Sequence, residues 1–220
     1  MRTLRNLAVP LSLKDMAFQS IKAVILSKKL VPGKIYNEQA LAKELGISKT
    51  PVREALLDLA SKGFVTFIPR KGVQINALTE KDVRDLYEVR IALETAIIRC
   101  ITPNLTDVIM RKIDTIHKKE KEAIKAVDRL GYLRIDREFH LYLASLTGNR
   151  YMIASLENIR DLIDWMGFKA LTRQERMEEV EHEHEKVIEK LRKGDPKGAE
   201  HLMEEHIRIT VKNVLQWLKA

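Results

Sequence analysis

The fold of the N-terminal third is decided by residues 45–56, which read LGISKTPVREAL. Gly46 suits a helix end, because glycine readily adopts the left-handed conformation that closes many helices. Thr50 is a good N-cap residue, and Pro51 suits the first helical position, where a missing N–H costs nothing. The sequence therefore predicts a turn and then a helix that starts at Thr50 and ends at Gly63, with an apolar stripe of Val52, Ala55, Leu56 and Leu59.

Further elements are predicted on both sides of this helix. Upstream, capping residues and apolar spacing predict one helix from Ser12 to Lys29 and a second from Asn37 to Gly46. Downstream, the β-prone stretches 64–68 and 73–75 flank Pro69-Arg70-Lys71-Gly72, which predicts a hairpin with a basic tip. Three helices followed by a hairpin is the order of a winged helix-turn-helix, and we assign this domain to residues 1–77.

The net charge of +8 is divided unequally along the chain. Residues 1–77 hold 13 Lys and Arg against 5 Asp and Glu, whereas residues 78–220 hold 26 of each kind. This asymmetry is typical of a polyanion-binding module joined to a neutral one, although clustered solubility charge would give the same count.

Residues 78–220 have a purely helical pattern. Proline, glycine and asparagine breaks divide them into helices near 79–101, 104–127, 129–147, 149–168, 172–193 and 196–218, which predicts an all-α bundle of about six helices in a mainly α chain. The single cysteine, Cys100, falls in an apolar helical pattern and is expected to be buried and inert. No apolar run approaches the roughly 18 residues of a membrane span, so we expect a cytoplasmic protein.

Several short motifs run through residues 12–76, namely Val31-Pro32-Gly33, Leu41-Ala42, the run 45–56, Gly63 and Lys71-Gly72. Together they resemble the winged-helix domain of the GntR family of transcription regulators. The resemblance implies that DNA is contacted by Gln39, Ser48, Lys49, Thr50, Arg53, Lys71 and Gly72. Lys49 and Gln39 stand where arginine is common in the family, a departure that bears on base preference.

Helical phase separates the six histidines, all of which follow residue 78. His140, His184 and His206 fall on the apolar faces of three different helices, and Asp136 lies one turn before His140. The remaining histidines fall among charged residues and are expected at the surface: His117, His182 and His201.

A buried carboxylate beside buried imidazoles needs a partner, because an uncompensated charge is costly in a core. A divalent metal would satisfy Asp136 and the three histidines together. Ligation by three nitrogens and one oxygen suits Zn²⁺, with Ni²⁺ and Mn²⁺ as alternatives. The competing interpretation is a hydrogen-bonded core cluster without an ion.

The same residues stand in motifs: Asp136-x-x-Phe139-His140, His184 followed by Gly194-Asp195, and His206-Ile207. Over about residues 79–218 these motifs resemble the FCD effector domain of the FadR subgroup of GntR regulators. In its metal-binding members the corresponding aspartate and histidines hold the ion, so the resemblance implies that Asp136, His140, His184 and His206 are ligands. A subset of the subgroup lacks these ligands and binds acyl-CoA, and the complete set argues against that branch.

Arg90 and Glu94 lie four residues apart within the apolar stripe of helix 79–101. They form either an ordinary intrahelical ion pair or a site in which Arg90 clamps an effector's carboxylate, which a guanidinium matches bidentately. The resemblance implies small organic acids as effectors, and Arg90 is therefore the candidate effector-binding residue.

The sequence thus predicts a homodimeric repressor that binds a double-stranded DNA operator and responds to a small carboxylate at a buried metal site. One alternative is a metal-responsive repressor without an organic effector. A metal-dependent enzyme is a weaker alternative, because no convincingly placed general base accompanies the predicted ligands.

Overall fold

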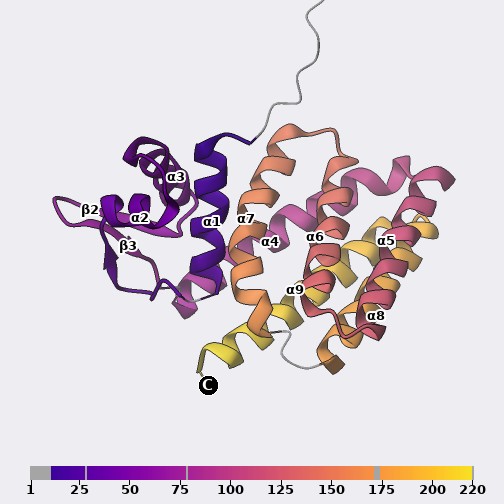
Figure 1. Cartoon of the computed structure of the whole chain (residues 1–220). Helices are drawn as coiled ribbons and strands as arrows, with labels where there is room; N and C mark the ends of the chain where they lie inside the picture. Colours follow the sequence, from indigo (N-terminus) through magenta and orange to yellow (C-terminus); the bar gives the residue numbers. More distant parts are fainter. Residues whose placement is uncertain (1–10, 28, 78, 171–173, 220) are drawn as a thin grey trace, which may run out of the picture. The chain divides into compact units, whose positions relative to one another are not determined.

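The computed structural model in Figure 1 describes residues 11–27, 29–77, 79–170 and 174–219. It divides into two compact units, Met1–Ala77 and Leu78–Ala220. Within the described residues the chain is mainly α-helical, as the sequence predicts, and its strands all lie in the first unit.

The N-terminal unit has the predicted order of three helices and a hairpin. The helices are α1 (Leu13–Leu26), α2 (Glu38–Leu45) and α3 (Lys49–Ser61), and the hairpin strands are β2 (Val65–Ile68) and β3 (Gly72–Ile75). The side chains of Ser12 and Asn37 cap the first two helices, and Gly46 ends α2 with a φ of 67°. These local signals explain why the predicted boundaries agree closely with the structure.

A short strand that was not predicted, β1 (Ile35–Tyr36), completes the sheet of the N-terminal unit. It pairs antiparallel with β3, so the strand order is β1-β3-β2. Two residues are too few to show an alternating pattern, and this strand exists because β3 offers it a paired edge.

The predicted apolar stripe of α3 forms the centre of the N-terminal core. Its four residues are completely buried, and α1 packs against α3 through a matching apolar face. This packing leaves the opposite face of α3 exposed, with Lys49, Thr50 and Arg53 on it. The fold therefore presents the basic face of the predicted recognition helix to solvent.

The C-terminal unit consists of six helices and one 3-10 turn in its described residues. The helices are α4 (Glu80–Ile101), α5 (Asp107–Lys125), α6 (Arg129–Ser145), α7 (Arg150–Ala170), α8 (Gln174–Arg192) and α9 (Pro196–Lys219), and residues Thr102–Asn104 form the turn. Each predicted helix is present, and the breaks lie at the predicted proline and glycine positions.

The helices of this unit surround one apolar core, in which polar side chains are also buried. Helix α9 packs along α4 and α8, while α6 lies between α5 and α7 (Figure 1). Large apolar residues such as Tyr87, Phe139 and Met203 fill the core. Eleven polar or charged residues of the described chain are also buried, and all of them lie in this unit.

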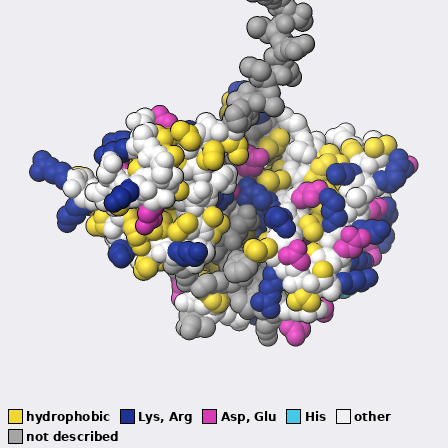
Figure 2. Space-filling model, viewed as in Figure 1, with side chains coloured by type: hydrophobic (Ala, Val, Ile, Leu, Met, Phe, Trp, Pro, Cys, Tyr) yellow, Lys and Arg dark blue, Asp and Glu magenta, His cyan; other side chains and the backbone are white. Residues whose placement is uncertain are grey.

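The surfaces of the two units differ in charge as their sequences do. Figure 2 shows basic side chains with few acidic ones on the visible face of the N-terminal unit, and both signs interspersed on the helical unit. Among the described helices, none combines the length and apolar character that crossing a membrane requires.

Candidate DNA interface and candidate metal centre

The N-cap of helix α3 lies two residues earlier than predicted. Ser48, with a φ of −69° and a ψ of 162°, is the N-cap, and Thr50 lies inside the first turn, so the assignment of Thr50 as N-cap was wrong. Pro51 is consequently the third helical residue. The prediction erred because the first four helical N–H groups have no intrahelical partner, so proline is tolerated throughout this turn. The Ser48 hydroxyl makes no capping hydrogen bond.

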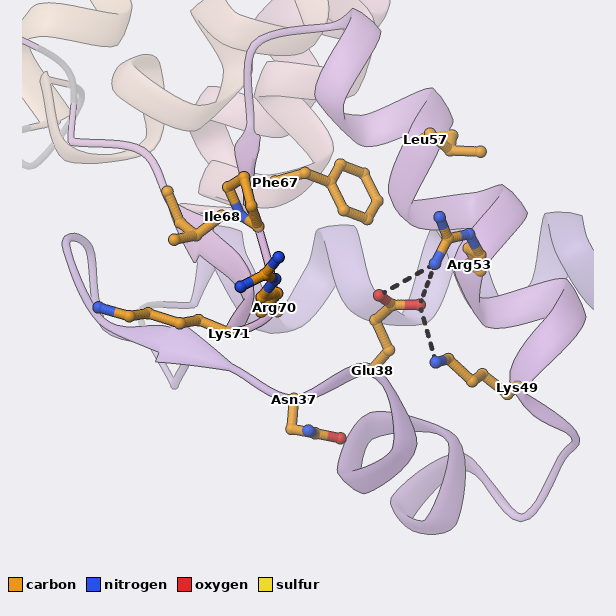
Figure 3. A pocket seen from close by; sticks show the side chains of 11 residues that line it. Asn37, Glu38, Lys49, Arg53, Leu57, Phe67, Ile68, Arg70 and Lys71 are labelled. Atoms are coloured by element: carbon orange, nitrogen blue, oxygen red, sulfur yellow. Dashed lines mark hydrogen bonds and ion pairs between the residues drawn. The ribbon is translucent and has the colours of Figure 1, made fainter.

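The predicted DNA-contacting residues lie on α2, α3 and the hairpin. Six of them are exposed, and the seventh, Gly72, is half-buried. A groove of about 550 Å³ runs between the N-terminal turn of α3 and the hairpin tip, and its lining includes Lys49, Arg53, Arg70 and Lys71 (Figure 3). Such a basic groove can hold a nucleic-acid backbone between a helix and a wing.

An acidic residue that the sequence analysis missed stands in this groove. Glu38, the first residue of α2, places its carboxylate 3.3 Å from Nη1 of Arg53 and 3.7 Å from Nζ of Lys49 (Figure 3). The guanidinium of Arg53 also lies over the ring of Phe67, 5.9 Å from its centroid. In sequence Glu38 resembles an ordinary acidic residue at a helix start, so only the packing of α2 on α3 reveals this contact.

Gly72 has a structural reason to be glycine. Its φ is 126°, and a Cβ at this position would lie 2.2 Å from the carbonyl oxygen of Tyr36. The pairing of β1 with β3 therefore requires glycine here, independently of any approach to DNA.

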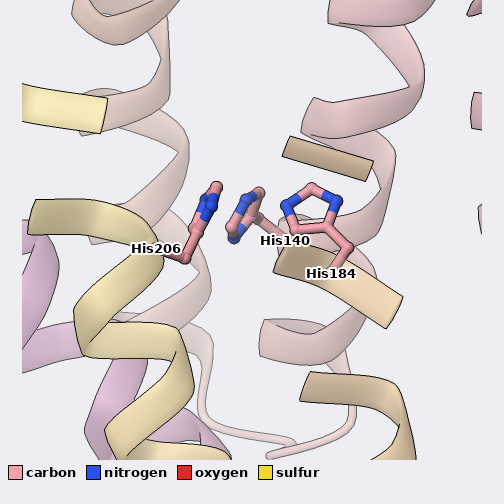
Figure 4. Close-up of side chains that lie close together, drawn as sticks. All are labelled: His140, His184 and His206. Atoms are coloured by element: carbon pink, nitrogen blue, oxygen red, sulfur yellow. The ribbon is translucent and has the colours of Figure 1, made fainter. Parts of the chain in front are cut away.

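Three histidines meet inside the helical unit. His140 on α6, His184 on α8 and His206 on α9 are all buried, and one ring nitrogen of each lies within 4.8 Å of the others (Figure 4). Ring centroids are 5.2 Å apart for His140 and His184 and 4.7 Å apart for His184 and His206. Helical phase thus correctly placed these three histidines inward, and His182 and His201 are exposed, as predicted.

Each imidazole in this cluster has a carboxylate on its Nδ1 atom. His184 contacts Glu120 of α5 at 2.9 Å, His206 contacts Glu183 of α8 at 2.7 Å, and His140 contacts Glu94 of α4. A neutral imidazole that donates its Nδ1–H to a carboxylate keeps its lone pair on Nε2. The three carboxylates therefore orient the histidines and select one tautomer for each of them.

Asp136 joins the cluster from α6. Its Oδ1 atom lies 3.8 Å from Nε2 of both His140 and His184, and its Oδ2 atom accepts a hydrogen bond from the buried Arg160 of α7. Burial opposes ionisation of Asp136, but Arg160, the neighbouring imidazoles and Arg90 together outweigh it and lower the pKa of this carboxyl below its ordinary value. Asp136 is thus an anionic oxygen donor beside the imidazole nitrogens.

Arg90 is buried as predicted and contacts two members of the cluster. Its Nε donates to Glu94 at 2.6 Å, and its Nη2 lies 3.1 Å from Nε2 of His140. It therefore forms the predicted intrahelical ion pair and also reaches the histidines.

The donor set fits a divalent metal ion. Within the described residues, Nε2 of His184 and of His206 is buried without a hydrogen-bond partner, and each faces the cluster. Buried polar atoms are rarely left in this way, and a carboxylate on the far nitrogen is typical of metal-ligating histidines. Three imidazole nitrogens and the Asp136 carboxylate form a set that suits Zn²⁺, Ni²⁺ or Mn²⁺.

Two of the imidazoles are neutral at pH 7. Burial lowers the pKa of His140 to about 3 and that of His206 to about 4, despite their carboxylate partners. For His184, burial also favours the neutral form, but the carboxylates of Glu120, Asp136 and Glu183 together outweigh it and raise the pKa above the usual value. A metal at this site therefore competes with a proton chiefly at His184.

Other residues around the cluster were missed by the sequence analysis. Glu120 and Arg160 lie on the apolar faces of their helices, where helical phase could have found them. Glu183 directly precedes His184, and its carboxylate is held by the buried Arg176 at 2.7 Å. This carboxylate reaches His206 because α9 packs on α8, a contact that sequence does not reveal.

Two expectations about single residues were wrong. His117 is buried rather than solvated, because α8 packs on α5 and places Glu181 2.6 Å from its Nε2. Cys100 is exposed rather than buried, because its position on α4 is turned away from the buried Ile97, Ile98 and Ile101.

Comparison with known proteins matches both units to families. Residues 13–75 match the model described as "Bacterial regulatory proteins, gntR family", and residues 85–209, more than half of the chain, match the FCD domain. One solved structure, "E. coli McbR/YncC", has a TM-score of 0.78 at 20% identity and covers 94% of this chain and 99% of its own. Another, "Metal-free FCD domain of TM0439 a putative transcriptional regulator", has a TM-score of 0.57 at 25% identity and covers 66% of this chain and 99% of its own.

Curated transcription regulators are similar to this chain over most of its length. The chain is 28% identical over 186 residues to the "Uncharacterized HTH-type transcriptional regulator YdhC" of Bacillus subtilis (strain 168), covering 83% of this chain and 82% of the relative. It is 27% identical over 165 residues to the "Gluconate operon transcriptional repressor" of Bacillus licheniformis, covering 75% of this chain and 67% of the relative. The family and these relatives are transcription regulators and not enzymes, and FCD domains can bind metal. The chain is therefore a member of the GntR family of transcription regulators, with an FCD domain after its DNA-binding domain.

Proposed function

We propose that this GntR-family regulator is a dimeric repressor whose helical domain holds a divalent metal and a small carboxylate effector. Asp136, His140, His184 and His206 would be the ligands, and Zn²⁺ is the ion that the donor set suits best, with Ni²⁺ and Mn²⁺ as alternatives. Binding of the carboxylate would change the affinity for operator DNA.

The arrangement of the three histidines is the observation that carries this proposal. Each donates its Nδ1 proton to a different glutamate, and the Nε2 atoms converge with the Asp136 carboxylate. A purely structural cluster of this kind would leave two buried ring nitrogens without a hydrogen-bond partner, which costs free energy. A bound ion removes that cost and supplies a Lewis-acidic centre for an anionic ligand.

The charges around the cluster support an anionic effector. Four carboxylates and three guanidiniums contact the histidines or their partners, namely Glu94, Glu120, Asp136, Glu183, Arg90, Arg160 and Arg176. With neutral imidazoles this set carries one net negative charge, and a divalent ion changes it to one net positive charge. A monocarboxylate would neutralise the loaded site. One relative is named for the gluconate operon, and gluconate is a monocarboxylate.

Arg90 is the proposed partner of the effector. In the absence of metal its Nη2–H donates to the lone pair of His140 that a metal would take, so guanidinium and metal are alternatives at that atom. A metal ligated by His140 would therefore release an N–H group of Arg90 next to the ion. A carboxylate can accept that N–H, which links effector binding to the metal.

The DNA-binding half of the proposal rests on α2, α3 and the hairpin. Arg53 would read a guanine edge, and Lys71 would contact phosphate from the wing. Ser48, Lys49 and Thr50 would meet phosphate at the N-terminus of α3. Gln39 and Gly72 would lie beside these contacts. A dimer would place two such helices in successive major-groove segments of a pseudo-palindromic operator. Effector binding would change operator affinity by a coupling free energy of roughly 1–3 kcal/mol.

Metal content of the purified chain tests the proposal. His184→Ala and His206→Ala are compared with His182→Ala and His201→Ala, which remove exposed histidines from the same helices. We expect about one ion per chain in the wild type and in the two controls, and loss of the ion in the two core variants. Metal-free wild-type protein, after purification with zinc present, would refute the proposal.

Measurements of operator binding distinguish control by an organic effector from control by the metal ion itself. Gluconate that releases DNA only from the metal-loaded protein supports an organic effector. Release by chelation alone, with no response to carboxylates, would instead make the ion itself the signal.

A further inference from the structure

The groove of the N-terminal unit contains an acidic side chain in a position that should disfavour DNA. Among the described residues that line it, Glu38 is the one acid, and Lys49, Arg53, Arg70 and Lys71 are the bases. The Glu38 side chain is only 12% exposed, and it lies between the two cations of α3 (Figure 3). An acid at this place lowers the attraction for phosphate, so its presence calls for a compensating role.

The geometry of the Glu38–Arg53 contact suggests that role. Both carboxylate oxygens lie near the same atom of Arg53, Nη1, at 3.3 and 3.4 Å. This contact uses one end of the guanidinium and leaves the edge formed by Nε and Nη2 for another acceptor. The N7 and O6 atoms of guanine match such an edge bidentately.

Two contacts from different elements fix the direction of Arg53. Glu38 approaches from α2, and the ring of Phe67 lies under the guanidinium from β2. An arginine side chain loses considerable rotamer freedom when it binds, and a guanidinium that is already oriented loses less. Because the Arg53 side chain is 56% exposed, this ion pair adds little to folding stability, so its effect falls on recognition.

We propose that Glu38 is a specificity-determining residue of the DNA-binding unit, which positions Arg53 to read a guanine and reduces the binding of Lys49 and Arg53 to arbitrary phosphates. It acts through Arg53 and needs no contact with DNA of its own. This inference rests on the proposed DNA interface but is independent of the metal and the effector.

The test uses the full-length chain and a pool of double-stranded oligonucleotides with a randomised core. The pool is selected separately with the wild type, with Glu38→Gln and with Glu44→Gln. Glu44 is the matched control, because it is an exposed acid on the same helix and its substitution changes the charge equally. Preference at each selected position and the salt dependence of binding to an unselected duplex are then measured.

We expect Glu38→Gln to lower the preference for guanine at one position of each half-site by about fivefold or more. We also expect the slope of log K against log salt on the unselected duplex to steepen by about one, because two cations lose their intramolecular partner. Glu44→Gln should keep the wild-type preference. In an Arg53→Ala background, Glu38→Gln should have no further effect on that position.

Several outcomes would overturn the inference. The inference is refuted if Glu38→Gln retains the wild-type preference for guanine, or if Glu44→Gln loses that preference as well. A thermal melt of each variant separates loss of folding from loss of recognition. If the wild type selects no sequence at all, the proposed DNA interface fails and this inference fails with it, whereas intact selection that ignores Glu38 refutes this inference alone.

Discussion

Nη2 of Arg90 lies 3.1 Å from Nε2 of His140, the nitrogen that faces the other two histidines of the cluster. The same guanidinium donates through Nε to Glu94, which in turn accepts from Nδ1 of His140. Arg90, Glu94 and His140 thus form a closed hydrogen-bonded ring in the core. Any ligand that takes the His140 lone pair must open this ring at Arg90.

A first prediction concerns the order of binding. Sodium gluconate should raise the melting temperature of the zinc-loaded protein but not of the chelated protein, because without metal Arg90 is occupied by Glu94 and His140. At a ligand concentration of 100 Kd the gain in stability is about 2.7 kcal/mol, and each kcal/mol shifts the melt by roughly 2–4 °C. Melts at matched sodium chloride provide the control. An equal shift in chelated protein would contradict the coupling.

A second prediction concerns the carboxylate behind His206. Glu183→Gln should weaken zinc binding about 10–100-fold, because the amide cannot accept the Nδ1 proton as strongly and no longer orients the ring. Glu179→Gln is the matched control, since Glu179 also contacts Arg176 but its side chain is 57% exposed. Competition with a chromophoric chelator at pH 7 measures both affinities. Equal affinities in the two variants would show that Glu183 does not act on the ligand.

A third prediction concerns the stability of the metal-free protein below neutral pH. His140 and His206 have pKa values of about 3 and about 4 when folded and about 6.5 when unfolded, so the unfolded state binds more protons between these values. Stability should therefore fall as the pH falls from about 6.5 toward 4. Because two imidazoles titrate in this range, the slope approaches about 2.7 kcal/mol per pH unit. His184, whose pKa is raised, affects the slope only above about pH 6.5, where the folded state keeps its proton and the unfolded state loses it.

Urea unfolding of the chelated protein at several pH values measures this slope. His206→Gln should reduce it, because this variant removes one of the two titrating imidazoles, whereas the exposed His201→Gln should leave it unchanged. A free energy of unfolding that stays constant from pH 7 to pH 5 would contradict the neutral state of the buried histidines.

A fourth prediction separates the structural role of Gly72 from DNA contact. Gly72→Ala should destabilise the N-terminal unit more than Gly63→Ala. Both glycines have a positive φ, but only at Gly72 would the new Cβ clash with the backbone, at the carbonyl of Tyr36. The conformational cost alone is about 1–2 kcal/mol at each site. Thermal unfolding of both variants measures the difference. Equal destabilisation would mean that β1 can move away from β3 without cost.

Much of the architecture was readable from local sequence. Ser12, Asn37 and Gly46 mark helix ends because capping depends on a few neighbouring residues. Helical phase separated His184 from His182, because two residues on one helix differ in direction whatever lies outside it. The four predicted ligands also lie together in one cluster, because the helical phase of each turns it toward the same core.

The tertiary structure decided which groups those residues meet. Glu120 reaches His184 from another helix, and Glu38 reaches Arg53 across the turn between α2 and α3. His117 is buried only because α8 covers it. Periodicity determines which face of a helix turns inward, but it does not determine which helix packs there or in what register. The orientation of the proposed metal ligands and of Arg53 therefore depends on contacts between elements, which local sequence alone does not specify.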